Sequence, residues 1–309
     1  MRTAFVDTLC RIAEEDDRIW LLTGDLGFSV LERFAQRFPD RFVNAGVAEQ
    51  NMTGLAAGLG ATGKVVFTYS IANFPTLRCL EQIRNDVCYH QVAVKVVAVG
   101  GGLAYGSAGY SHHAVEDLAI MATLPNMAVF APGDPVEARL VTQAAVQHGG
   151  PCYLRLGKAG EPLIHQQPPV FEFGKAITVR DGGDVAILST GGMLGAAVRA
   201  ADILATRGIS SLVLSLPTLV PFDEAGVVAA GRRTGRMITV EEHGPGALAD
   251  LVAMTLALHA VQTRFSPLRL PREACTVAGS RSELLATYGL SMQAIINAVV
   301  HSESDCDDK

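Results

Sequence analysis

A glutamate follows a short apolar run and a glycine in the segment Asn44-Ala45-Gly46-Val47-Ala48-Glu49. The residues after it have helical spacing, so the pattern predicts a strand end, a sharp turn and Glu49 at the mouth of a helix. Ligands of parallel α/β proteins bind at this carboxyl edge of the strands, which makes Glu49 a candidate functional group. The alternative is that its charge only complements the helix dipole, an effect of about 0.3–1 kcal/mol.

A glycine-rich segment from Gly100 to Gly109 is followed by the adjacent histidines His112 and His113. Its glycines do not match the Gly-x-Gly-x-x-Gly spacing of a dinucleotide-binding loop. Imidazoles on a long loop can move protons or hydrogen-bond a polar substrate, so both histidines are candidates for that role. The alternative is a pair of surface histidines next to a helix start.

Aromatic and basic residues follow two other predicted strands. Tyr69 and Phe74 come just after the apolar run 64–68, where a ring could stack on a planar heterocycle, although such rings commonly belong to the core. Arg155 ends the run 152–155, and its planar guanidinium suits a phosphate or a carboxylate. The alternative for Arg155 is an ion pair or a solvated side chain.

Apolar runs alternate with helical patterns along the chain, which predicts an α/β fold with mostly parallel sheets covered by helices on both faces. The alternation breaks after Gly157, where prolines and the turn Asp181-Gly182-Gly183 occur, and it resumes near 185. We therefore predict two doubly wound domains, residues 1–165 and a smaller one at 183–301, joined by a linker over 166–182. The charged segment 302–309 is predicted to be a disordered tail.

The composition narrows the class of protein. The 309 residues carry a formal net charge of −6, which does not suit a nucleic-acid-binding protein. The sequence contains no apolar run of the roughly 18 residues that a membrane span needs, and its acidic start is a poor signal peptide. The six scattered cysteines contain no Cys-x-x-Cys pair, so we expect reduced thiols, no metal site and a cytoplasmic protein.

Taken in order, these segments resemble the transketolase family. The motif Gly46-Val47-Ala48-Glu49-Gln50-Asn51-Met52 is similar to that of the family's pyrimidine-binding domain. The second half, with Ser189-Thr190-Gly191-Gly192 and Thr239-Val240-Glu241-Glu242-His243, resembles its C-terminal domain. The similarity extends over about residues 3–300, and it implies the two-domain fold of that family.

The resemblance implies a role in thiamine diphosphate chemistry, in which a two-carbon ketol unit passes from a ketose to an aldose. It assigns to Glu49 the catalytic hydrogen bond to nitrogen N1′ of the cofactor's aminopyrimidine. It places Phe74 on the pyrimidine ring and Asp25 near the thiazolium, with Tyr69 in the same aromatic loop. His112 is implied as a catalytic and substrate-binding residue, and the other implied substrate-binding residues are His113 and Arg155.

The family's magnesium-binding Gly-Asp-Gly motif is missing, because the Gly-Asp pairs at Gly24, Gly133 and Gly183 do not continue to glycine. Split transketolases take that domain from a separate subunit, and the segment 111–117 resembles the split class. The resemblance therefore implies an N-terminal partner subunit that holds Mg²⁺ and the diphosphate, in a heterotetramer that acts on a small sugar or sugar-like substrate.

Two positions depart from the family's pattern. Ala108 stands where typical members have an aspartate, and Gly100 or Gly101 where they have a phosphate-binding histidine. Both changes predict weak activity on ordinary pentose phosphates. Two other functions stay open at this point: the β subunit of a 2-oxo acid dehydrogenase, and a non-catalytic scaffold subunit that kept the fold.

Overall fold

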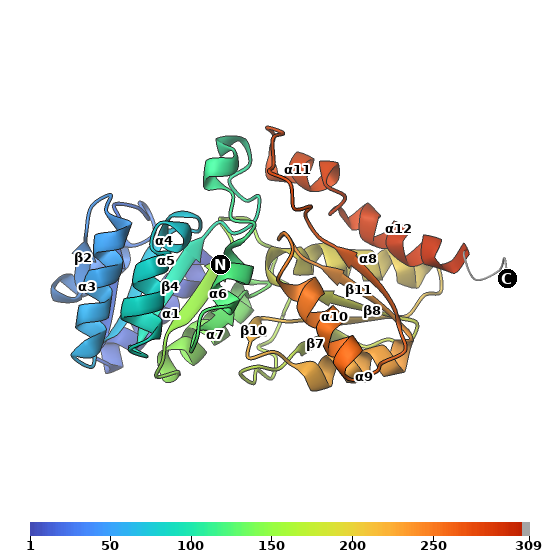
Figure 1. The fold of residues 1–309 in the computed structure, drawn as a ribbon, viewed down its shortest axis with the longest axis horizontal. Helices are drawn as coiled ribbons and strands as arrows, with labels where there is room; N and C mark the ends of the chain where they lie inside the picture. Colours follow the sequence, from blue (N-terminus) through green and yellow to red (C-terminus); the bar gives the residue numbers. More distant parts are fainter. Residues whose placement is uncertain (305–309) are drawn as a thin grey trace.

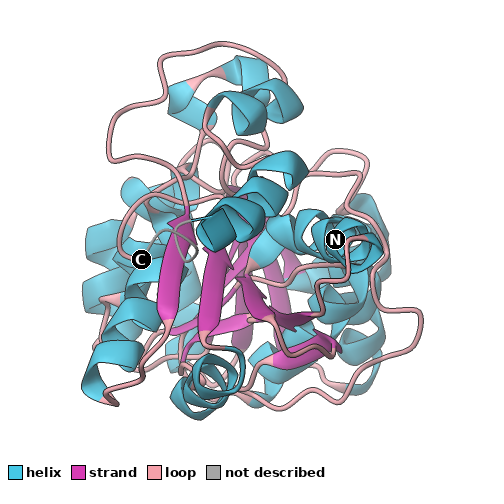
Figure 2. Ribbon diagram, turned by 90° about the vertical axis from the view of Figure 1, so that its right-hand side faces the viewer, coloured by secondary structure: helices cyan, strands magenta, loops and turns pink. Residues whose placement is uncertain are grey.

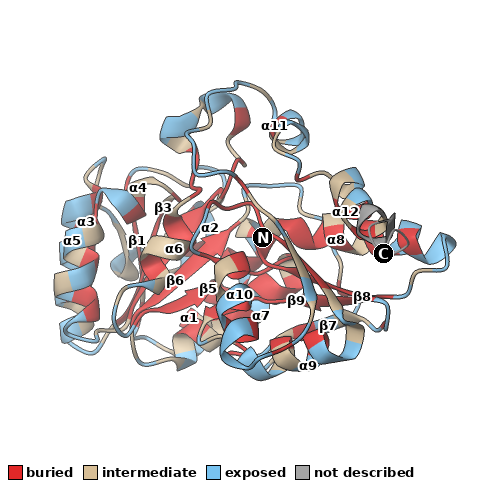
Figure 3. Ribbon diagram, turned by 45° about the vertical axis from the view of Figure 1, so that its right-hand side comes forward, coloured by how far each residue is buried: buried red, intermediate tan, exposed pale blue. Residues whose placement is uncertain are grey.

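The computed structural model describes residues 1–304 and shows two α/β domains side by side, each built on its own sheet (Figure 1). In the view along the long axis, the strands lie in the middle and helices surround them (Figure 2). The strands are mostly buried and the outer helix faces are exposed (Figure 3). The predicted α/β class with mostly parallel sheets is confirmed.

The sheet of the first domain has seven strands. Across the sheet they are β10 (Thr218–Val220), β5 (Ala128–Phe130), β6 (Cys152–Leu156), β4 (Val94–Val99), β3 (Val65–Ile71), β1 (Ile19–Thr23) and β2 (Phe42–Asn44). All pairs are parallel except β10 with β5. The carboxyl ends of the parallel strands therefore share one edge, where Glu49 was expected.

Helices on the two faces of this sheet bury different strand residues. On one face, α1 (Arg2–Glu15) and α7 (Pro135–Gln147) pack on a cluster that includes Phe67. On the other face, α3 (Glu49–Ala61) packs on a cluster that includes Val66. Because neighbouring strand residues point to opposite faces, this alternation fixes which side chains of β3 can approach Glu49.

The remaining helices of the first domain are short. The segment after β3 is divided into α4 (Phe74–Leu77), α5 (Leu80–Gln82) and a π-helical turn, Ile83–Cys88. The other two are α2 (Glu32–Arg37) and α6 (Asp117–Ala122). Asp134 caps α7, because its Oδ1 accepts from the N–H of Glu137 at 2.8 Å.

The sheet of the second domain has five strands. Across the sheet they are β12 (Arg264–Leu268), β11 (Arg236–Val240), β8 (Val185–Ser189), β9 (Ser211–Ser215) and β7 (Ile177–Arg180). Its helices are α8 (Leu194–Thr206), α9 (Glu224–Thr234), α10 (Leu248–Leu258), α11 (Arg281–Thr287) and α12 (Met292–Ser304). The antiparallel edge strand β7 lies inside the range 166–182 that the sequence predicted as a linker.

The two domains are interlocked. Strand β10 belongs by sequence to the second half of the chain, yet it pairs with β5 of the first sheet. Next to it, the N–H of Gly191 donates to the carbonyl of Ala131 at 3.0 Å. These contacts make the second domain a direct support for the carboxyl edge of the first.

The end of the chain differs from the predicted tail, since α12 continues to Ser304. The rest of that tail, 305–309, lies outside the described residues. Within them, one segment, Arg281–Val300, is long and apolar enough to cross a membrane. It divides into α11 and α12, whose buried Leu284, Ile295 and Val299 pack into the core of the second domain, while most of its other residues are half-buried or exposed. The five described cysteines are free thiols.

Candidate active site

Glu49 is the first residue of α3, at the carboxyl edge of β1 and β2, as its motif predicted. Its side chain is only 4% exposed. Gly24, just after β1, lies against it, since a Cβ atom at Gly24 would be 3.5 Å from Cγ of Glu49. One carboxylate oxygen, Oε2, accepts from Nη1 of Arg78 at 3.2 Å. The carboxylate is thus buried but turned toward a hollow lined by α3 and Arg78.

A row of rings and cations leads away from this carboxylate. The guanidinium carbon of Arg78 lies 4.2 Å from the ring centre of Phe74. The ring of His112 meets Phe74 edge-on, with centres 5.3 Å apart, and Tyr105 lies 5.8 Å beyond His112. Nζ of Lys158 lies 4.6 Å from the centre of the Tyr105 ring. Four separate segments of the chain therefore meet at one edge of the sheet.

Asp25 lies at the same edge, immediately after Gly24, but it is exposed. Its Oδ1 accepts from Nδ2 of Asn44 at 2.9 Å, and its N–H donates to Oδ1 of Asn44 at 3.0 Å. Asn44 also holds the turn before α3, because its Oδ1 accepts from the N–H of Gly46 at 3.0 Å. The structure therefore brings Glu49, Phe74, His112 and Asp25 to one edge.

The contacts of Arg78 test whether a flat heterocycle would fit here. The guanidinium is planar, donates to Glu49 and covers the face of Phe74. An aminopyrimidine is also planar, and it would need the same two contacts: a hydrogen bond to the carboxylate and a ring to stack on. The open hollow at Glu49 has a volume of about 440 Å³ and is lined by Val47, Ala48, Gln50, Asn51 and Arg78. The residues present fit such a group once Arg78 moves aside.

Comparisons with known proteins agree with this geometry. The family description "Transketolase, pyrimidine binding domain" matches residues 1–160, and "Transketolase, C-terminal domain" matches residues 174–295. The chain belongs to the transketolase family. It consists of that family's pyrimidine-binding and C-terminal domains, in that order.

Two relatives and one solved structure match this chain over nearly its full length. It is 38% identical to a subunit of the apulose-4-phosphate transketolase of Phocaeicola vulgatus, covering 95% of this chain and 94% of that one. It is 36% identical to a 6-deoxy-6-sulfo-D-fructose transketolase subunit of Clostridium sp., covering 96% and 92%. A structure described as a split gene transketolase, inactive β4 tetramer, superposes with a TM-score of 0.87 at 36% identity, covering 97% and 96%.

Tyr69, predicted to bind the cofactor, lies on the other face of the transketolase sheet. It belongs to β3, which continues to Ile71, and strand alternation turns it toward α1. There it stacks on Phe5, with ring centres 6.2 Å apart, and is buried in the same cluster as Phe67. Burial raises the pKa of Tyr69 to about 12. Its position is that of a core residue, so we no longer assign it to the cofactor.

His113 and Arg155, predicted to bind substrate, are instead engaged within the protein. Nε2 of His113 is 2.9 Å from the carbonyl oxygen of Gly106, and the side chain is buried. Nε of Arg155 donates to Oδ2 of Asp117 at 2.9 Å, and Nη2 donates to the carbonyl of Ala114 at 2.7 Å. These contacts hold the backbone on either side of His112, at Gly106 and Ala114. Neither His113 nor Arg155 makes a ring contact with Phe74, His112 or Tyr105.

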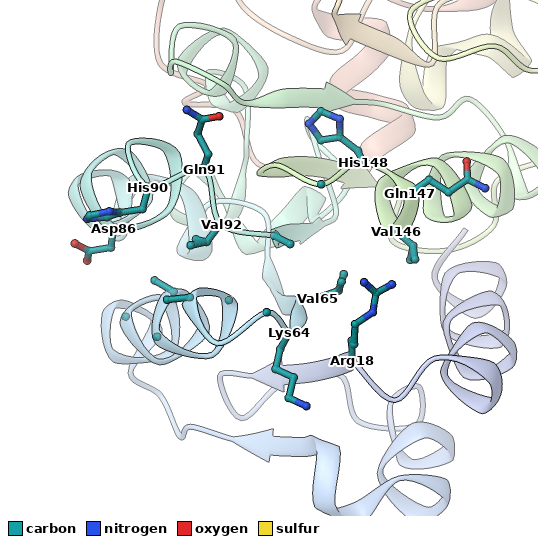
Figure 4. Close-up of a pocket in the computed structure, with 18 residues that line it drawn as sticks. Arg18, Lys64, Val65, Asp86, His90, Gln91, Val92, Val146, Gln147 and His148 are labelled. Carbon is teal, nitrogen blue, oxygen red and sulfur yellow. The ribbon is translucent and has the colours of Figure 1, made fainter.

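A larger hollow lies elsewhere, at the amino edge of the first sheet. It has a volume of about 1000 Å³, and Arg18, Lys64, His90 and His148 line it (Figure 4). None of the predicted site residues line it. Because ligands of parallel sheets bind at the opposite, carboxyl edge, we place the active site at Glu49 despite the smaller volume there.

Proposed function

We propose that this chain is the pyrimidine-binding subunit of a two-subunit transketolase that transfers a ketol unit from a ketose to an aldose. The observation that carries the proposal is the buried Glu49 carboxylate, joined to the ring of Phe74 by the planar guanidinium of Arg78. The family depends on thiamine diphosphate, which supplies, when bound, the nucleophilic thiazolium carbon that cleaves the ketose. The relatives are named transketolase subunits, which favours this function over a 2-oxo acid dehydrogenase β subunit.

In this proposal Glu49 holds a proton between its carboxylate and nitrogen N1′ of the aminopyrimidine. A buried carboxylate suits that task because little water competes for the hydrogen bond. Phe74 provides the stacking face, and Asp25 lies toward the thiazolium. His112 faces the substrate: Nδ1 lies 3.0 Å from Oγ of Ser111, which leaves Nε2 for a substrate hydroxyl.

The row beyond His112 favours a substrate that carries an anionic group. Lys158 places a positive charge beside Tyr105, two ring contacts from Phe74. The two relatives are named for a phosphorylated and a sulfonated sugar, which are both anionic. We therefore propose a ketose with a terminal phosphate or sulfonate, whose charge Lys158 binds.

The structure also gives a physical reason why the family's histidine is missing near Gly100. This glycine has φ +79°, and a Cβ atom there would lie 2.2 Å from Cε2 of Tyr105. The Tyr105 ring thus occupies the space into which a side chain at position 100 would extend. This supports recognition that differs from that of ordinary pentose phosphates, as Ala108 also suggests.

We further propose an N-terminal partner subunit that holds Mg²⁺ and the diphosphate, in a cytoplasmic heterotetramer. Phe28 and Val47, which both precede Glu49 in the sequence, are 70% and 75% exposed and offer apolar surface to a partner chain. The similar β4 tetramer is described as inactive, which is consistent with a missing partner.

Reconstitution tests the proposal. The chain is mixed with an N-terminal transketolase subunit, magnesium and thiamine diphosphate, and a phosphorylated or sulfonated ketose is supplied with an aldose acceptor. Ketol transfer without release of carbon dioxide supports the proposal. Decarboxylation of a 2-oxo acid would identify a dehydrogenase subunit, and unchanged activity in Glu49→Ala would identify a scaffold.

A further inference from the structure

The loop that carries His112 and Tyr105 is closed at its base by two hydrogen bonds. The N–H of Gly102 donates to the carbonyl of Ala114 at 2.7 Å, and the N–H of Ala114 donates to the carbonyl of Gly102 at 3.0 Å. The loop rises above the two sheets beside α11 (Figure 1). Its ring contacts with Phe74 therefore depend on how this base is held.

The second domain holds the base through Glu242, which follows β11. Its Oε1 accepts from the N–H of Leu103 at 2.8 Å, in a buried contact across 139 residues of sequence. Its carbonyl accepts from Nη2 of Arg155 at 3.0 Å, and the same Nη2 donates to Ala114. One residue of the C-terminal domain thus touches one side of the loop directly and the other side through Arg155.

Only a glycine fits beside this contact. Gly102 has φ +67°, and a Cβ atom there would lie 2.5 Å from Cγ of Glu242. The backbone of Gly102 therefore lies so close to Glu242 that no side chain fits between them. A second close approach occurs at Gly106, which lies against the backbone of Gly279 and Arg281.

Arg281, the first residue of α11, fixes the glutamate in turn. Its Nε lies 3.1 Å from both carboxylate oxygens of Glu242, and its Nη2 also donates to Oε2. Glu242 is 4% exposed, so the guanidinium is what compensates its buried charge. A planar guanidinium binds both oxygens at once, which fixes the carboxylate's orientation toward Leu103.

We propose that Glu242, oriented by Arg281, is a positioning residue for ketol transfer: it sets the height of the His112 loop over Phe74. Neither residue makes a ring contact in the row from Glu49 to Lys158, and Glu242 reaches the loop directly through the N–H of Leu103. This assigns to the C-terminal domain the task of holding the substrate side of the site in place. The inference rests on the proposed function.

The test uses the chain in complex with its N-terminal subunit, and compares Glu242→Ala, Glu242→Gln and Arg281→Lys with wild type. We expect kcat/KM of Glu242→Ala to fall at least tenfold, mainly through a higher donor KM, while the cofactor Kd changes less than twofold. Glu242→Gln keeps an acceptor for the Leu103 N–H and should recover part of the loss. Arg269→Gln is the control, because Arg269 pairs with Asp250 in the same domain, away from the loop.

Hydrogen exchange on the same complexes gives a readout that does not need activity. Peptides covering 103–113 should exchange at least fivefold faster in Glu242→Ala, and those of α3 should not change. Kinetics within twofold of wild type together with unchanged exchange would overturn the inference, as would equal losses in Arg269→Gln. If Glu242→Ala fails to fold, Glu242→Gln and Arg281→Lys decide by the same two measurements. A wild-type complex without ketol transfer refutes the proposed function instead, whatever the exchange data show.

Discussion

Arg78 covers the ring of Phe74, with its guanidinium carbon 4.2 Å from the ring centre, while its Nη1 donates to Glu49 at 3.2 Å. Arg78 is the residue that follows α4, and its side chain is 52% exposed. The guanidinium of Arg78 is open to solvent while the carboxylate of Glu49 is buried, so another hydrogen-bond donor at Glu49 could replace the arginine. In the proposed function, the pyrimidine takes the place of this guanidinium at Glu49 and Phe74.

Replacing Glu49 with Gln should remove control of the proton at N1′. We expect kcat for ketol transfer by the complex to fall at least 100-fold, equivalent to a barrier higher by about 3 kcal/mol. The fold should be retained, because Glu49 lies at a helix start and its side chain supports little packing. Steady-state kinetics and circular dichroism measure the two effects.

Glu224→Gln is the matched control for that experiment. Glu224 is also the first residue of a helix, α9, but it is exposed and pairs with His259. Its replacement should leave kcat unchanged. Activity of Glu49→Gln within about tenfold of wild type would count against the assigned role.

Replacing Arg78 with Ala should open the face of Phe74. Because the cation no longer competes with the pyrimidine for the ring, we expect the complex to bind thiamine diphosphate about fivefold more tightly, which is ~1 kcal/mol. Calorimetry on the reconstituted complex measures the change in Kd. Arg84→Ala is the control, since Arg84 donates to the neighbouring Asn85 instead. Weaker binding by Arg78→Ala would show that the arginine stays in the site as a ligand.

Replacing Lys158 with Met should remove the charge that we assign to the substrate's anionic group. The KM for a phosphorylated or sulfonated donor should rise at least tenfold, and the KM for an uncharged donor should stay within twofold. Lys64→Met, at the amino edge of the sheet, controls for the loss of one positive charge. Equal effects on charged and uncharged donors would refute the role of Lys158.

Much of the fold could be predicted from the sequence, because strong local patterns decide it. The apolar runs 64–68 and 152–155 predicted two strands, which the structure contains as β3 and β6. The strands β7, β10 and β12 were not predicted, since they are short edge strands whose pairing depends on distant segments. The transfer of β10 to the other domain's sheet has no local signal at all.

The sequence predicted a residue's place in the fold where one local motif determines it, and did not predict that place where distant contacts determine it. Glu49 and Phe74 each follow a strand end, so their place at the carboxyl edge follows from chain order. Tyr69 was misplaced because β3 is longer than the apolar run suggests, and alternation then turns the ring away. The ring contacts of Arg78 and Lys158 were not predicted, because no sequence pattern near either residue indicates a contact with an aromatic ring.

Two buried groups after β11 should give opposite pH dependences to the stability of the protein. Burial raises the pKa of Glu241 to about 7 from its ordinary value of 4.5. The folded state then holds the proton that the unfolded chain releases, so this contribution to stability is complete below pH 4.5 and is lost as pH rises to 7. Burial lowers the pKa of His243 from 6.5 to about 4, so its contribution is complete above pH 6.5 and is lost as pH falls to 4.

Between pH 4.5 and 6.5 the two slopes oppose each other, and the wild-type free energy of unfolding should change little. Glu241→Gln removes one slope, so its stability should fall as pH falls, by about 1.4 kcal/mol per pH unit at most. Urea unfolding at three pH values in this range measures it. The exposed Glu224→Gln should behave as wild type, and a flat profile in Glu241→Gln would contradict the assignment.

The isolated chain should bind thiamine diphosphate only at millimolar concentrations or worse. The contacts that we propose for it are limited to one carboxylate, one stacking face and the exposed Asp25, and these must overcome the entropy lost on association. The diphosphate carries most of the charge, and neutralising it takes a magnesium ion with oxygen ligands. Among the described residues, the one group of three clustered ligands, Asp134, Glu137 and His165, is buried and occupied by its own hydrogen bonds.

Calorimetry on the purified chain with magnesium and cofactor tests this directly, and addition of the N-terminal subunit is the positive control. We expect no measurable heat for the chain alone and binding at least 100-fold tighter once the partner is present. Glu49→Ala in the complex shows how much of that affinity the pyrimidine contacts supply. Micromolar binding by the chain alone would show that the diphosphate site lies within these 309 residues and that the partner is not needed for the cofactor.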